Sequence, residues 1–126
     1  MTYLTLEDLF ALVELLFGTR RMVRDPGLLD ASTYRPRATM FGDDLYPTVH
    51  LKAAALMESL TCNHPLIDGN KRLAFIATVT FYGLNGWRLQ LPNRDAGVDL
   101  VLGVAKGEVE LSGIARTLES WARRTP

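Results

Sequence analysis

The chain of 126 residues is poor in cysteine and histidine and carries no excess of either charge. Its single cysteine, Cys62, excludes an intramolecular disulfide and favours a reducing compartment, so we expect a cytoplasmic protein. Basic and acidic residues each number 14, which argues against a dedicated nucleic-acid-binding module, because such modules usually carry a basic excess. A zinc site is not expected either, because only Cys62, His50 and His64 offer soft ligands.

Long apolar runs are also missing. No stretch reaches the roughly 18 apolar residues needed to cross a bilayer, and residues 1–5 lack the basic region and apolar run of a secretory signal. We therefore expect no membrane association. The hydrophobic content of 48% is still enough for a real core, and the length fits one domain over residues 1–126.

The spacing of apolar residues predicts six helices and almost no strand. The fourth is expected to begin around Gly69, and the others after the capping residues Thr5, Asp25, Thr48, Asn93 and Ser112. The expected ends lie at Gly18, before Pro36, at Asn85-Gly86 and near Gly107. Residues 36–47 have the composition of a loop with room for a small hairpin, and 88–91 suggest a short extended segment.

The fourth of these helices, from Leu73 to Leu84, is apolar nearly all round. A helix of this kind is normally the central, buried one. We found no repeats, linkers or low-complexity segments. The sequence therefore predicts a compact, all-α domain of six helices wrapped around residues 73–84.

The stretch from His64 to Arg72 reads His-Pro-Leu-Ile-Asp-Gly-Asn-Lys-Arg and lies directly before that helix. It places an imidazole, a carboxylate, a glycine, an amide and two cations where a helix N-terminus offers free N–H groups and a positive dipole end. It is not a P-loop, because the upstream glycine and the hydroxyl residue after Lys71 are missing. The stretch predicts a phosphate-handling site.

Several of these residues have two interpretations. His64 can act as a general base near neutral pH or only bond to its own loop, and Asp68 can hold Mg²⁺ or cap the helix. Gly69 can admit a ligand close to the backbone or simply form the turn. Asn70 can support the loop or contact a phosphate.

Lys71 and Arg72 oppose the helix dipole, which suggests a bound polyanion, although two solvated charges remain the alternative. Cys62 lies two residues before His64, so a catalytic pair is conceivable. We favour a small buried residue at a helix end.

The nine residues resemble the signature of the Fic/Doc superfamily, H-x-F-x-D/N-A/G-N-K/G-R, and lysine in the eighth place is similar to the Doc toxin branch. The similarity extends to segments 24–29, 35–39, 53–55, 84–86 and 106–108, and covers essentially the whole chain. One departure is Leu66, where the family has phenylalanine. We expect this side chain to point into the core and anchor the loop, with activity retained.

The resemblance implies a Fic-type fold and a toxin that pairs with a Phd-type antitoxin. Fic enzymes transfer AMP from ATP, whereas Doc toxins act as protein kinases on a threonine of elongation factor Tu and stop translation. By this resemblance, His64 would deprotonate the threonine and Asp68 would hold Mg²⁺. The ATP phosphates would be bound by Gly69, Asn70, Lys71 and Arg72.

Two rival functions remain. Transfer of AMP is disfavoured by Lys71, which stands where AMP-transferring relatives have glycine. A catalytically inactive protein that acts as a co-repressor with its antitoxin is disfavoured by the intact motif.

The partner surfaces are less specific. The antitoxin groove is expected as an exposed apolar surface. The basic cluster of Arg20, Arg21 and Arg24 either meets an acidic antitoxin segment or is solvated. Residues 39–41 either contact the substrate as a flap or pack their loop onto the body.

Overall fold

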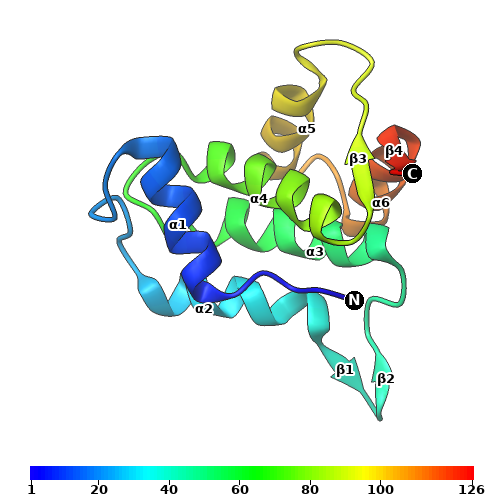
Figure 1. Cartoon of the computed structure of the whole chain (residues 1–126), viewed down its shortest axis with the longest axis horizontal. Helices are drawn as coiled ribbons and strands as arrows, with labels where there is room; N and C mark the ends of the chain where they lie inside the picture. Colours follow the sequence, from blue (N-terminus) through cyan, green and yellow to red (C-terminus); the bar gives the residue numbers. More distant parts are fainter.

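The computed structural model describes residues 1–126 and shows a mainly helical protein with small pieces of strand (Figure 1). The helices are α1 (Leu6–Phe17), α2 (Pro26–Tyr34), α3 (Val49–Cys62), α4 (Asn70–Leu84), α5 (Ala96–Ala105) and α6 (Leu111–Trp121). A single turn of 3₁₀ helix, η1 (Arg35–Arg37), follows α2 directly. The predicted six helices are confirmed. None of them combines the length and the apolar character of a membrane span.

Three of the predicted caps are present because each side chain lies three residues before the amide that it accepts from. Thr5 forms a reciprocal capping box with Asp8, Asp25 accepts from the amide of Leu28, and Thr48 caps α3 in the same way. These bonds fix where α1, α2 and α3 begin.

Two other predicted caps are wrong. The carboxamide of Asn93 accepts from the amide of Asp95 in a turn, and α5 begins only after Asp95. Helix α6 begins after Glu110, so Ser112 lies within its first turn rather than at its cap. Neither helix has a side-chain hydrogen bond at its N-cap.

The strands form two small antiparallel ribbons. Strands β1 (Thr39–Met40) and β2 (Asp43–Asp44) make the hairpin that projects from the body in Figure 1, as the composition of residues 36–47 allowed. Strand β3 (Trp87–Leu89) pairs with β4 (Ala122–Arg124) at the C-terminus. Strand β4 was not predicted, because three residues are too few to show a period of two.

Helices α3 and α4 run through the middle of the molecule (Figure 1). Nine of the 14 residues of α3 are buried, against six of the 15 in α4. The predicted central helix α4 therefore shares this place with α3, which is the more buried. The fully buried alanines 53–55 of α3 explain this, because small side chains let neighbouring helices approach closely.

Candidate functional site

The loop between α3 and α4 is held against the segment between α1 and α2. Val23 and Leu66 form an isolated antiparallel bridge, and the amides of Arg24 and Asp25 both donate to the carbonyl of Pro65, at 2.8 and 3.0 Å. The two segments lie side by side beside the end of α1 (Figure 1). Main-chain bonds from a distant part of the sequence therefore fix the loop that carries the motif.

His64 is an exposed residue whose backbone has a positive φ of 51°. Its carbonyl accepts a hydrogen bond from the guanidinium of Arg24. Its imidazole makes no hydrogen bond or ion pair within the chain. The interpretation of His64 as a residue that only bonds its own loop is therefore wrong, and the ring is available as a base.

Leu66 and Asn70 hold the loop from the inside. Leu66 is 1% exposed and belongs to the hydrophobic core, so the predicted inward anchor is confirmed. The Asn70 side chain accepts from the amide of Leu66 at 2.8 Å and donates to its carbonyl at 3.1 Å. This carboxamide supports the loop, and any contribution of Asn70 to phosphate binding falls to its main-chain N–H.

Gly69 is the N-cap of α4, with a φ of 85° and no side-chain capping bond. Asp68 does not cap the helix, because one carboxylate oxygen accepts instead from the next amide, that of Gly69, at 2.8 Å. The other oxygen of Asp68 has no partner. The first-turn amides of Asn70, Lys71 and Arg72 have no acceptor in the chain, which leaves an open anion site at the positive end of the helix.

Lys71 and Arg72 are exposed and have no carboxylate partner within ion-pair distance. The guanidinium of Arg72 lies over the ring of Phe17, 5.6 Å from its centroid. Two cations without acidic partners, added to the free amides, make this surface suited to a polyanion.

One pocket of about 420 Å³ collects these residues. It is lined by Thr61, His64, Ile67, Asp68, Gly69, Asn70, Lys71, Arg72 and Ala105. All six residues that the sequence singled out are therefore brought together. The pocket also contains Thr61, a buried residue whose hydroxyl has no hydrogen-bond partner, which was not predicted because a single threonine in an apolar helix carries no distinctive pattern.

Cys62 lies outside this pocket and is exposed, so the prediction of a buried residue is wrong. Partial desolvation, assisted by Glu58, raises the pKa of its thiol. A thiol with a raised pKa is mostly protonated at neutral pH and is a poor nucleophile. A catalytic pair of Cys62 and His64 has no support in this geometry.

A metal ion would have one protein ligand here. No three histidine, cysteine or acidic residues converge anywhere in the chain. The free oxygen of Asp68 is a hard donor at the edge of the anion site, which suits Mg²⁺ held jointly by one carboxylate and the phosphates of a nucleotide. The donor set fits such an ion and does not fit an all-protein metal centre.

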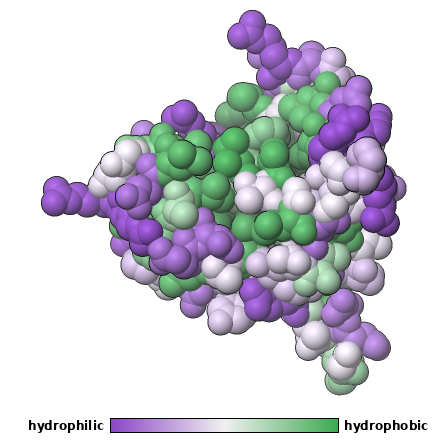
Figure 2. All heavy atoms as spheres, in the orientation of Figure 1, coloured by the Kyte–Doolittle hydropathy of each residue, from purple (hydrophilic) through white to green (hydrophobic).

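A second pocket of about 520 Å³ adjoins the first and shares Lys71 and Arg72 with it. Its other lining residues are Leu16, Phe75, Ile76, Leu91, Arg94, Gly97, Val98, Val101 and Leu102. Figure 2 shows hydrophobic side chains gathered on this face of the molecule, between α1 and α5. An apolar groove rimmed by cations thus lies beside the polar pocket.

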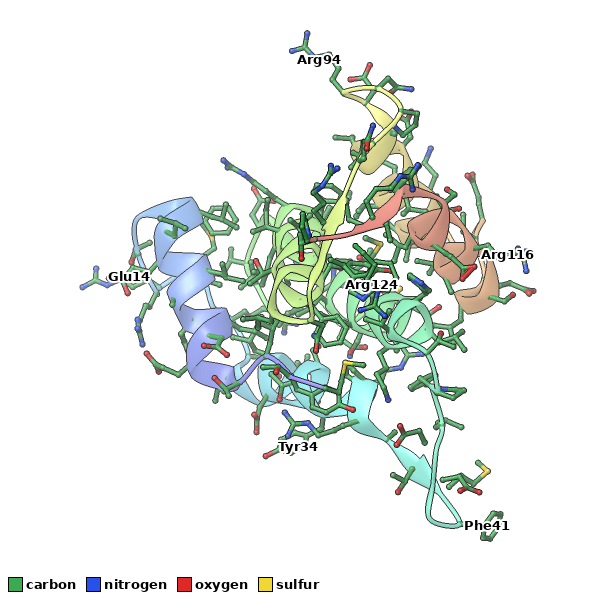
Figure 3. The ribbon with its side chains drawn as sticks, turned by 45° about the vertical axis from the view of Figure 1, so that its right-hand side comes forward. Glu14, Tyr34, Phe41, Arg94, Arg116 and Arg124 are labelled. Carbon is green, nitrogen blue, oxygen red and sulfur yellow. The ribbon has the colours of Figure 1, made fainter.

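The arginine cluster and residues 39–41, the other predicted contact surfaces, differ in whether they are free to bind a partner. Arg20 pairs with Glu7 and Glu14, at 2.7 and 2.8 Å, so it is not a free cation. At the hairpin tip, Phe41 is 99% exposed and points away from the body (Figure 3). The alternative that residues 39–41 pack their loop onto the body is therefore wrong.

The chain is similar to known proteins over most of its length. The family model described as Fic/DOC family matches residues 3–82. The chain is 45% identical to the protein named Toxin Doc of Mycolicibacterium smegmatis (strain ATCC 700084 / mc(2)155), over 95% of this chain and 93% of that one. It is 28% identical to Protein kinase doc of Escherichia phage P1, over 94% of each chain.

Proposed function

Because the chain belongs to the Fic/DOC family, as a member of its Doc toxins, we propose that it is a protein kinase. It would transfer the γ-phosphate of ATP to a threonine hydroxyl of elongation factor Tu and so inhibit translation. One observation carries this proposal: the pocket of about 420 Å³ combines an unbonded imidazole, a carboxylate with a free oxygen and unpaired cations at an uncapped helix N-terminus. The relative from phage P1 is named a protein kinase.

In the proposed reaction His64 accepts the proton of the threonine hydroxyl. The hydroxyl oxygen then forms a bond to the γ-phosphorus, while the bond between that phosphorus and its bridging oxygen breaks and ADP leaves. The first step requires an imidazole nitrogen that is free to accept a proton, and the exposed ring of His64 makes no hydrogen bond within the chain. Positioning and charge neutralisation account for most of the catalysis in phosphoryl transfer.

The remaining motif residues would hold the nucleotide. Lys71, Arg72 and the first-turn amides of α4 bind the phosphate oxygens, and Gly69 forms the left-handed turn from which those amides begin. Asp68 would hold Mg²⁺ through its free oxygen. When bound, this ion would neutralise charge on the phosphates.

Lys71 favours phosphoryl transfer over AMP transfer. Its side chain lines the pocket and occupies space that a glycine would leave open for an anion. We propose that ATP is thereby bound with its γ-phosphate, rather than its α-phosphate, next to His64.

The antitoxin partner would occupy the apolar pocket of about 520 Å³. Its lining is mostly aliphatic and aromatic, and Lys71, Arg72 and Arg94 supply the only charges. An amphipathic, acidic segment of a Phd-type antitoxin fits this chemistry, and it would cover the two motif cations. The reaction and its inhibition would both take place in the cytoplasm.

Radiolabelled ATP tests the proposed reaction. Purified elongation factor Tu is incubated with the protein, Mg²⁺ and ATP labelled at either the γ- or the α-phosphate. Label that transfers only from the γ-position supports the kinase. Label from the α-position would identify an AMP transferase, and no transfer from either would overturn the proposed substrate.

A further inference from the structure

We propose that Arg24 is a positioning residue for His64: its guanidinium holds the His64 carbonyl and so fixes the imidazole in the pocket. This inference adds a residue to the mechanism of the kinase proposed above and rests on that proposal. Arg24 precedes α2 and is separated from His64 by 40 positions. The nine-residue motif therefore does not contain this part of the site.

The backbone of His64 needs to be held. Only two non-glycine residues have a positive φ, Phe41 at the exposed hairpin tip and His64 at 51°. This region is unfavourable for residues with a Cβ, and the residue before a proline is pushed further toward extended backbone. A glycine would adopt this φ freely. A strained conformation at a catalytic position persists only where its surroundings fix it.

The residues on both sides of His64 are held by hydrogen bonds, so the chain must change direction at His64 itself. Before it, Asn63 is the C-cap of α3. Its amide donates to the carbonyl of Ser59 and its carboxamide donates to the Ser59 hydroxyl, both at 3.0 Å. After it, the Pro65 carbonyl accepts hydrogen bonds from two main-chain amides. The peptide plane between His64 and Pro65 completes this clamp, and the Arg24 side chain is the donor that holds it.

The guanidinium of Arg24 has no competing partner. Arg20 is engaged by two glutamates and the side chain of Arg21 makes no hydrogen bond or ion pair, whereas the guanidinium of Arg24 bonds only to the carbonyl of His64. A charged donor on a carbonyl makes a stronger bond than a neutral one. The one polar contact of this guanidinium is therefore with the main-chain carbonyl of the residue proposed as the base.

Kinetics separate positioning from phosphate binding. Arg24→Met removes the donor and keeps most of the length, and Arg21→Met is the matched control on the same segment. We expect Arg24→Met to lower kcat about tenfold or more, with KM for ATP and the thermal midpoint near wild type. Arg24→Lys should restore part of the loss. Unchanged kcat, or a rise in KM for ATP alone, would overturn the assignment.

A readout without substrate keeps the inference distinct from the proposed reaction. The Cα chemical shift and the HN–Hα coupling of His64, measured by NMR in the free protein, report its φ. We expect left-handed values in wild type and Arg21→Met, and a shift toward extended values in Arg24→Met. Identical His64 signals in all three proteins would refute the positioning role. Failure to phosphorylate elongation factor Tu would refute only the proposed function.

Discussion

The ring of Phe17 occupies the space into which any side chain at position 69 would project. A Cβ built on Gly69 would lie 2.4 Å from the nearest atom of that ring. The same ring lies under the guanidinium of Arg72. The last residue of α1 thus packs against the first turn of α4, and this contact requires glycine at the helix cap in addition to its φ of 85°.

Replacement of Gly69 by alanine should therefore be costly. The methyl group meets Phe17 and the residue must keep a positive φ, so we expect a loss of about 1–3 kcal/mol in the free energy of unfolding. Urea denaturation measures it. Gly83→Ala is the control in the same helix, because a Cβ there meets nothing within 4 Å, and it should stabilise by about 0.5–1 kcal/mol. Equal effects of the two substitutions on the free energy of unfolding would contradict this prediction and show that the Phe17 ring moves aside at no cost.

Restoring the family phenylalanine at position 66 should not improve the protein. Leu66 is 1% exposed in a packed core, and extra volume in such a place costs about 1–3 kcal/mol. We expect Leu66→Phe to lower the free energy of unfolding and leave turnover no higher, whereas Leu66→Met, which keeps the volume, should cost less than about 1.5 kcal/mol. A strong rise in turnover with Leu66→Phe would mean that leucine has compromised the natural enzyme.

Stability should fall on mild acidification because of His50. Desolvation lowers the pKa of this imidazole below its usual 6.5, and its Nδ1 lies 2.9 Å from the hydroxyl of buried Tyr82. Glu119, 3.8 Å from Nε2, favours the charged form but is largely exposed, so we take the ring to be neutral in the fold. Its nearest charged neighbour therefore does not form an ion pair with it at neutral pH.

The direction of this pH dependence of stability follows from proton binding to His50. Below about pH 6.5 the unfolded chain protonates His50 before the folded one does, so stability is full above that pH and declines as pH falls toward the lower folded-state pKa. Thermal midpoints between pH 7.5 and 5.5 should show this decline in wild type and less of it in His50→Gln. A pH dependence identical in the two proteins would assign it to other groups.

Lys71→Gly tests the direction of transfer. Loss of the side chain reopens the space beside α4 and removes one unpaired cation, so we expect phosphorylation of elongation factor Tu to fall at least about tenfold. Lys106→Ala is the control, because Lys106 is exposed and lies outside both pockets. Phosphorylation unchanged by Lys71→Gly would contradict the role given to this lysine.

The features that the sequence predicted depend on residues close together in the chain, whereas the features that it did not predict depend on residues far apart. Thr5, Asp25 and Thr48 cap helices through amides three residues away, and the motif is nine consecutive residues, so local patterns were sufficient. Long-range contacts carry no such pattern. The pairing of β3 with the C-terminal β4 and the bond from Arg24 to His64 depend on packing between distant segments.

Local competition explains the remaining errors. The carboxylate of Asp68 was a reasonable cap by position, yet it bonds the next amide instead of one further into the helix. Asn93 likewise closes a turn before α5 begins. Short polar side chains have several backbone partners within reach, and tertiary context selects among them.

Intact-mass spectrometry of elongation factor Tu is the most direct test of the central claim. The factor is incubated with the protein, ATP and Mg²⁺, in parallel with His64→Ala and with Arg21→Met as a surface control. We expect a gain of one phosphate with wild type and Arg21→Met and no gain with His64→Ala. A gain of one AMP, or a phosphate that appears without His64, would contradict it.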